Sequence, residues 1–253
     1  MKNLIILLFL SVLVAGCSSS SLNTIDFTAD KKLEYALKLF HDEDYLDAVQ
    51  EFQSIILQFP GNAVIDDAQY YLAQSRFERH EHIMAAYEFS KLIKQMPASE
   101  YVPTAQFMLA DSYYELSPDY RLEQQYTGKA IQEFQAFIDF FPTNEKVKDA
   151  EKKIAELNIK KAHKEFNTAT LYEDMHFYKA ATEYYENVVE EYHDTPYAPM
   201  ALYKKIKLLV DKEKNTEALI DSKRFIEKYP EDPNFNEIEE LKTSLETKLS
   251  LFK

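Results

Sequence analysis

The sequence predicts an all-α fold built from repeated helix pairs. Apolar residues recur at spacings of three and four, which is the period of an amphipathic helix. Glycine occurs only 3 times in 253 residues, whereas good helix formers are abundant. Prolines also follow equivalent apolar segments at near-regular intervals, which indicates that one structural unit is repeated.

Residues 1–16 are predicted to be a signal peptide. Lys2 provides a positive charge, an apolar run extends from Leu4 to Val14, and two small residues follow it. The alternative is a membrane helix that is retained in the mature protein. The run is shorter than the roughly 20 apolar residues that span a bilayer, which disfavours this alternative.

The stretch from Val14 to Cys17 resembles a bacterial lipobox, in which the cysteine becomes the lipidated N-terminus. The resemblance implies acyl chains on Cys17, and two or more such chains hold a protein firmly on a membrane. Ser18 implies sorting to the outer membrane, by resemblance to other lipoproteins. We assign residues 17–29 to a lipidated, flexible tether.

The composition excludes several classes of function. A formal net charge of -14 argues against nucleic-acid binding, which needs a basic surface. Cys17 is the only cysteine, which leaves no partner for a disulfide. Phosphate-binding loops, nucleophile elbows and dinucleotide fingerprints need glycines at fixed spacing. We therefore expect no enzyme activity, no catalytic residues and no cofactor.

The densest histidine cluster is His80-Glu81-His82. Residues two apart point to different sides of a helix, whereas a helical zinc pair needs a spacing of four. We therefore predict no metal site there.

Each predicted repeat has an alanine, an aromatic residue four positions later and an apolar residue three positions after that. The clear copies, each ending at proline or its equivalent, contain Ala48, Phe52, Ile55 and Pro60; Ala85, Phe89, Leu92 and Pro97; Ala130, Phe134, Phe137 and Pro142; and Ala181, Tyr185, Val188 and His193. A weaker fifth copy runs from Ala218 through Phe225 to Pro230. The period is near the tetratricopeptide length of roughly 34 residues.

Each copy is predicted to be the second helix of a pair whose first helix has its own alanine. These alanines are Ala36, Ala73, Ala110 and Ala169. Alanine lets two helices approach closely, and stacked pairs bury the faces that one pair leaves exposed. We therefore predict a tetratricopeptide-like solenoid of about five helix pairs with a C-terminal capping helix. An irregular helical bundle is the alternative.

Proline ends the second helix of each unit, because it cannot donate the helical hydrogen bond. His193 stands in place of the proline in the fourth unit. This replacement allows the fourth helix to run longer and the following loop to differ.

Residues 30–142 are predicted to hold repeats 1–3, and residues 143–253 a long connecting helix, repeats 4–5 and the cap. Residues 117–126, SPDYRLEQQY, lengthen the third unit into a loop that we expect to extend from one face. Lys146 to Tyr172 has no helix breaker, and its alternating charges predict a solvated, ion-paired face. A one-sided apolar stripe from Phe235 to Leu249 predicts the capping helix.

The concave side of a solenoid is lined mainly by the first helix of each pair and can bind peptides. Alignment of the first three units places a set of candidate groove residues there: Leu37, Phe40, Tyr70, Gln74, Phe77, Phe107, Asp111 and Tyr114. Gln74 and Asp111 are expected to engage the backbone of an extended substrate peptide. The alternative for each ring is packing between adjacent units.

Three segments resemble the BamD family, lipoproteins of the outer-membrane β-barrel assembly machinery that are built of tetratricopeptide-like repeats. They are YLDAVQEFQSIILQFP at 45–60, SPDYRLEQQYTGKAIQEFQAFIDFFP at 117–142, and the segment 148–203. The family's Tyr-Pro-Asp-Thr stretch is Tyr192-His193-Asp194-Thr195 here. Glu190-Glu191 stands where relatives tend to carry a basic residue, so their contacts cannot be transferred to this chain.

The resemblance implies a non-enzymatic scaffold that is lipid-anchored in the outer membrane and faces the periplasm. It implies that the C-terminal repeats bind a BamA-like barrel protein and that the N-terminal repeats bind unfolded outer-membrane proteins. Other assembly lipoproteins are further candidate partners. Candidate residues for BamA binding are Glu173, Asp174, Glu190, Glu191, His193 and Asp194. The alternative is a generic tetratricopeptide-repeat lipoprotein adaptor of the cell envelope.

Overall fold

The computed structural model describes residues 27–251. The predicted signal peptide, the lipidation site Cys17 and most of the tether lie outside the described residues. The helices are α2 (Ala29–His41), α3 (Tyr45–Gln58), α4 (Ile65–Glu78), α5 (His82–Gln95), α6 (Val102–Glu115), α7 (Gln125–Phe140), α8 (Val147–Asp174), α9 (Tyr178–Glu191), α10 (Tyr197–Asp211), α11 (Asn215–Lys228) and α12 (Phe235–Ser250).

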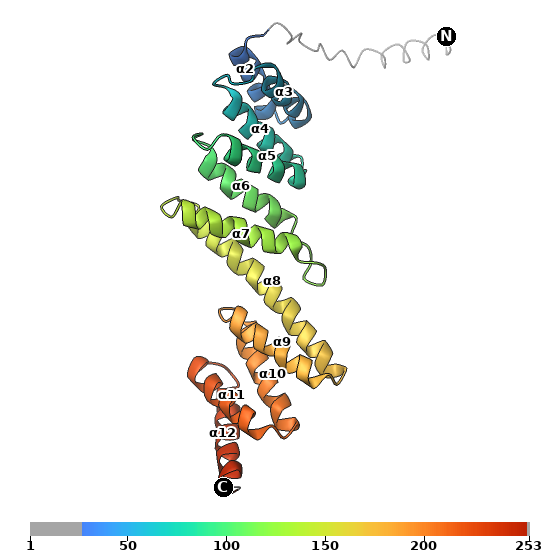
Figure 1. The fold of residues 1–253 in the computed structure, drawn as a ribbon, viewed down its shortest axis with the longest axis vertical. Helices are drawn as coiled ribbons and strands as arrows, with labels where there is room; N and C mark the ends of the chain where they lie inside the picture. The colour runs from blue at the N-terminus through green and yellow to red at the C-terminus, as the bar shows by residue number, and fades with distance from the viewer. Residues whose placement is uncertain (1–26, 252–253) are drawn as a thin grey trace, which may run out of the picture.

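Consecutive helices pack against each other along the whole described chain, so the fold is a linear stack of helix pairs. Figure 1 shows an elongated molecule, with α2 at one end and α12 at the other. The pairs are α2–α3, α4–α5, α6–α7, α8–α9 and α10–α11, and α12 packs on α11. The predicted all-α solenoid with a capping helix is confirmed.

The repeated alanine and aromatic positions form the core. In each of the first four pairs, both helices carry one of the repeated alanines, and all of these alanines are fully buried. Phe52, Phe89, Phe134, Tyr185 and Phe225 are fully buried beside them. Burial of each such ring stabilises the fold by about 1.5–3 kcal/mol. The repeated spacing of alanine and aromatic residues therefore predicts which side chains pack between the two helices of each pair.

The five loops between units have the same hydrogen bonds. The residue after each second helix, namely Phe59, Met96, Phe141, Tyr192 or Tyr229, accepts a bond at 3.0–3.1 Å from the N–H three residues later. That later residue is always Asn, Ser, Thr or Asp. In four loops its side-chain oxygen accepts a backbone N–H two residues further on, and in the fourth loop Thr195 Oγ1 donates to the Tyr192 carbonyl.

The replacement of proline by His193 changes neither the helix end nor the loop, so the expectation that it would was wrong. Helix α9 ends at Glu191, and Tyr192 has φ -125°, close to the -122° of Phe59 in the first unit. Burial of Tyr192 and the hydrogen bond from Thr195 define this turn without proline.

The turns inside four of the pairs place a non-glycine residue in the left-handed region. Glu43, His80, His176 and Glu213 have φ between 57° and 63°. The N–H after each of them bonds to a carbonyl near the end of the first helix, as in a Schellman motif. The third pair lacks this short turn and has the loop 116–124 in its place.

The loop 116–124, which was expected to extend from one face of the third unit, lies along α8. Lys160 Nζ donates to Ser117 Oγ at 2.7 Å, and Lys164 Nζ donates to the Leu122 carbonyl at 2.8 Å. The Tyr120 ring stacks on His163, with centroids 3.8 Å apart, and His163 stacks on Tyr197 of α10 at 5.0 Å. The loop therefore joins the third unit to the C-terminal units.

A polar contact recurs between the two helices of most pairs. Gln69 Nε2 donates to Glu88 Oε2 at 2.8 Å, and Gln106 Nε2 donates to Glu133 Oε2 at the same distance. Each glutamine lies four residues before the buried alanine of its helix, and each glutamate directly precedes the buried ring of its own. Lys32 and Glu51 occupy the same positions in the first unit, 3.6 Å apart. We call these contacts the interhelical polar pairs.

Candidate protein-binding surfaces

The eight candidate groove residues lie on α2, α4 and α6, the first helices of the first three pairs. Seven of them are half-buried, and each ring among them contacts another aromatic or histidine ring. Leu37 and Phe40 pack on the core of the first unit, and Phe77 packs on that of the second. The first helices therefore present partly exposed apolar side chains that also join neighbouring units.

Tyr70 is the clearest example of this double role. Its ring stacks on Tyr101, with centroids 4.3 Å apart and an interplanar angle of 12°. Its hydroxyl accepts a hydrogen bond from Gln74 Nε2 at 2.8 Å. Burial raises the pKa of Tyr70 above its ordinary value. Gln74 therefore orients Tyr70 in the free protein. To bind a peptide backbone, the Gln74 amide must first give up its hydrogen bond to the Tyr70 hydroxyl.

Phe107 does not line an accessible groove, so its assignment is corrected. It is only 5% exposed and packs edge-on against Phe134 and Phe137, with centroids 5.5 and 5.4 Å apart. Ala150 and Leu157 of α8 belong to the same buried cluster, and Lys146, next to α8, lies 4.9 Å from the centroid of the Phe107 ring. Phe107 is thus a core residue of the third unit.

Asp111 and Tyr114 contact α8 in the described structure. Asp111 forms an ion pair with Lys153, and Tyr114 donates a hydrogen bond to Glu156 at 2.7 Å. The hydrogen bond to Glu156, followed by burial, raises the pKa of Tyr114 to about 12. Lys153 also lies 4.0 Å from the centroid of the Tyr114 ring. The end of the candidate groove is therefore closed by α8.

The candidate partner-binding residues fall at the two ends of α9. Glu173 and Asp174 lie at the α8–α9 turn, where Tyr185 donates a hydrogen bond to Glu173 at 2.7 Å. Glu190, Glu191, His193 and Asp194 lie at the α9–α10 loop, and all four are exposed. A helix of 14 residues is roughly 21 Å long, so the six residues form two separate surfaces.

Glu190 is held by Arg224 of α11, which also donates to Glu186 at 2.8 Å. Lys205 of α10 bridges Glu186 and Asp221 at 2.7 and 2.9 Å. This ion network stabilises the packing of α9, α10 and α11. Glu190 is therefore partly a structural residue.

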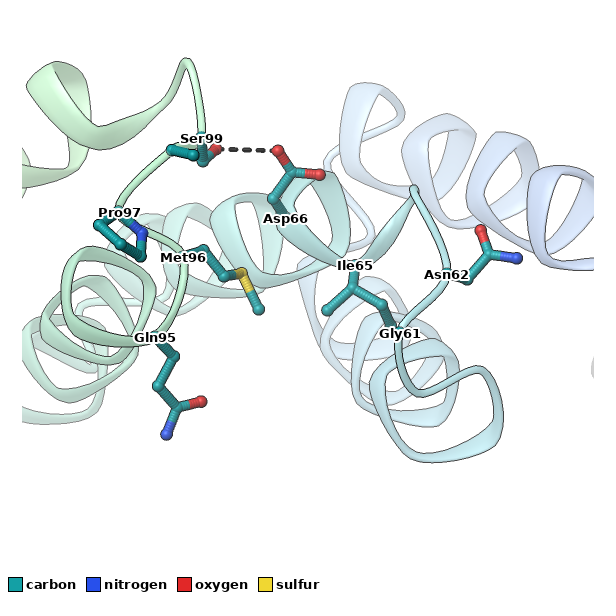
Figure 2. A pocket seen from close by; sticks show the side chains of 9 residues that line it. Gly61, Asn62, Ile65, Asp66, Gln95, Met96, Pro97 and Ser99 are labelled. Carbon is teal, nitrogen blue, oxygen red and sulfur yellow. Dashed lines mark hydrogen bonds between the residues drawn. The ribbon is translucent and has the colours of Figure 1, made fainter.

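A pocket lies between the α3–α4 loop and the α5–α6 loop. Figure 2 shows Ile65 and Met96 in its wall, with Gly61 and Pro97 on the two loops. Ser99 Oγ donates to Asp66 at 2.9 Å and ties the α5–α6 loop to the first turn of α4. None of the eight candidate groove residues lines this pocket. It is a shallow gap between two copies of the same turn.

The sequence did not single out an apolar surface at the α8–α9 turn. Leu171, Met175 and Phe177 are exposed there, and the exposed fraction of Phe177 is 54%. Phe177 and Tyr172 line an open hollow with Tyr178. Exposed apolar side chains at a turn are the only sequence signal for such a site, and helical periodicity does not detect them.

Among residues 27–251 no group of three or more histidine, cysteine, aspartate or glutamate side chains could hold a metal ion. The Glu81 carboxylate is bound by Arg76 at 2.7 Å and Arg79 at 2.8 Å. No helix in this part of the chain is both long and apolar enough to cross a membrane.

Glu165 is an exception to the interhelical polar pairs. It occupies the position of Gln69 and Gln106, but Tyr184 lies at the facing position of α9. Burial, and then the nearby Glu191 carboxylate, raise the pKa of Glu165 above its ordinary value. The fourth unit therefore contains a carboxylate that is better tolerated in its neutral form.

We expect Glu165→Gln to raise the melting temperature at pH 7. Because the folded-state pKa is raised, the folded protein binds this proton more tightly, and stability is lost as pH rises through that pKa. Glutamine removes the charge and keeps the shape. The gain should vanish below about pH 4, where glutamate is neutral in both states. Calorimetry at both pH values tests this, with the exposed Glu227→Gln as the control; a gain that persists at low pH would contradict it.

Residues 28–213 match the model of the family described as "YfiO: Outer membrane lipoprotein". The match covers most of the chain, from the start of α2 to the end of α10. The chain belongs to this outer membrane lipoprotein family. No curated protein sequence matches it.

Among solved structures, the chain is similar to the TPR2AB-domain:pHSP90 complex of yeast Sti1, with 17% identity and a TM-score of 0.42, over 87% of this chain and 84% of that chain. It is also similar to a thermophilic TPR protein of Thermus thermophilus, with 17% identity and a TM-score of 0.37, over 88% of this chain and 99% of that chain.

Proposed function

We propose that this protein is a non-enzymatic lipoprotein scaffold of the outer-membrane β-barrel assembly machinery. The observation that supports it is the family match over residues 28–213, on a chain that folds as a helical-repeat solenoid. The resemblance of three segments to the BamD family points in the same direction. Helical repeats position partners by binding, and such a role needs no cofactor.

The anchor of the scaffold is the lipidated Cys17, and residues 17–29 connect it to the solenoid. The tether joins the solenoid at α2, the N-terminal end in Figure 1. With the acyl chains in the inner leaflet of the outer membrane, the helix pairs extend into the periplasm. In this arrangement the first units lie nearest the membrane and the C-terminal units are free to contact a partner domain.

We assign the two proposed binding roles to two different surfaces. The acidic α9–α10 loop, with Glu191, His193 and Asp194, binds the periplasmic domain of a BamA-like barrel protein. The half-buried rings of α2 and α4, namely Phe40, Tyr70 and Phe77, bind apolar side chains of unfolded barrel proteins. Because those rings also join neighbouring units, substrate binding depends on small movements between units.

We expect the double variant Glu191→Lys/Asp194→Lys to bind the periplasmic domain of the barrel protein at least tenfold more weakly. Reversal of two exposed charges places like charges against the partner, which costs about 1.4 kcal/mol or more in binding. Surface plasmon resonance with the purified domain measures this. The matched control is Asp42→Lys/Asp47→Lys, two exposed acids of the first unit. Equal affinity of both variants would place the interface elsewhere.

A further inference from the structure

A small hollow lies at the opposite end of α9 from the proposed BamA-binding loop. Leu208 and Leu209 of α10 form its apolar floor, and both are buried. Lys179 of α9 and Lys212 and Lys214 of the α10–α11 turn form its rim. The hollow therefore combines an apolar floor with a ring of three positive charges, in a chain whose net charge is -14.

The rim lysines can accept a new anionic partner. Lys212 lies 2.8 Å from Asp211, Lys214 lies 3.2 Å from Glu217, and Lys179 lies 3.9 Å from Glu183. Exposed ion pairs of this kind contribute at most about 1 kcal/mol each, so an incoming carboxylate can replace the present partners. The Lys212 ammonium also lies 3.6 Å from the centroid of the Tyr178 ring, which holds it at the mouth of the hollow.

The hollow continues into the apolar surface at the α8–α9 turn. Tyr178 and Lys179 line both the hollow over Leu208 and the neighbouring one formed by Tyr172 and Phe177. An extended segment can therefore place one apolar side chain on each side of Tyr178. The three lysines favour carboxylates beside the side chain that enters the enclosed hollow.

We propose that this surface binds an acidic peptide segment of a partner protein, in which a leucine-sized side chain lies next to aspartate or glutamate. The apolar floor accepts the side chain, and the rim lysines bind the flanking carboxylates. The C-terminal units lie at the opposite end of the solenoid from α2, the end nearest the proposed lipid anchor, which favours a peptide over an anionic bilayer as the occupant (Figure 1). This site goes beyond the proposed function, because it stands whatever the α9–α10 loop binds.

The test selects a phage-displayed library of random twelve-residue peptides on the immobilised full chain. The consensus peptide is then synthesised, and its affinity is measured by fluorescence anisotropy at two salt concentrations. We expect peptides with leucine beside acidic residues, bound at least tenfold more weakly by Lys179→Glu/Lys214→Glu. The matched control is Lys94→Glu/Lys148→Glu, two exposed lysines outside the hollow, which should bind as the wild type does.

A second variant tests the apolar floor without a change of charge. Thr182→Trp places a large ring over the hollow, since Thr182 lines it from α9. Binding of the same peptide should also fall at least tenfold, with an unchanged far-ultraviolet circular dichroism spectrum. The proposal is overturned by selection of basic peptides, by no enrichment of acidic ones, or by equal affinity of all variants. Binding to phosphatidylglycerol vesicles with no acidic peptide selected overturns it as well.

Discussion

Replacement of Phe134 by alanine is expected to lower the free energy of unfolding by about 3–5 kcal/mol, since it removes a buried ring and leaves a cavity. Phe134 is fully buried in α7 and contacts Phe107 of α6, with ring centroids 5.5 Å apart. The third unit also connects the units on both of its sides, so its loss weakens both interfaces. Urea unfolding followed by circular dichroism at 222 nm measures the change.

The same helix offers a matched control. Phe140 is 74% exposed, near the C-terminal end of α7. Phe140→Ala removes the same atoms but leaves no cavity, so its effect should stay within about 0.5 kcal/mol. Similar losses in both variants would contradict the assignment of the repeated aromatic positions to the core.

Replacement of Lys205 by methionine should destabilise the C-terminal units by about 3 kcal/mol. The Lys205 side chain is 15% exposed and bridges Glu186 and Asp221. Removal of the cation leaves two carboxylates close together and poorly solvated, which is the costly way to break such a network. Thermal unfolding at pH 7 measures the loss. It should shrink at low pH, where the two carboxylates become protonated.

Lys207 provides the control on the same helix. It lies 2.9 Å from Glu237, but both side chains are about half exposed. Lys207→Met should therefore change the stability by less than about 1 kcal/mol. The triple variant Lys205→Met/Glu186→Gln/Asp221→Asn should recover part of the loss, since it leaves no unpaired charge. A loss that the triple variant leaves unchanged would show that Lys205 acts through packing alone.

The fold followed from the sequence because its main determinants are local and repeated. Alanine and an aromatic residue at helical spacing describe the contact between two helices, and proline marks the end of the second one. The long α8 and the capping α12 also matched their predicted ranges, since neither range contains a breaker. These features depend on residues that are close together in the sequence, so a single sequence is enough to predict them.

The candidate sites were harder to predict because they depend on what a longer helix covers. α8 lies against the third unit, so Phe107 is buried and Asp111 is paired with Lys153. The predicted solvated face of that helix is also partly engaged, since Lys160 and Lys164 bind the loop 116–124. Such contacts join residues about 42 positions apart, and no local pattern records them.

The loop after α9 shows a different limit of sequence reasoning. Proline after the second helix predicts where that helix ends, but its absence at His193 has no effect on the helix end. The Asn, Ser, Thr or Asp four residues after the end of each second helix is common to all five loops and predicts the turn better. It could have been recognised in the sequence as a turn residue, since these side chains bond to the backbone of their own turn.

Co-purification tests the central claim most directly. The tagged, lipidated protein is extracted in detergent, and the proteins bound to it are identified by mass spectrometry. We predict recovery of a large barrel protein with soluble periplasmic repeats, reduced by Glu191→Lys/Asp194→Lys and lost on deletion of residues 147–253. Recovery of wall-synthesis proteins without any such barrel protein would contradict the claim and identify a generic lipid-anchored repeat adaptor.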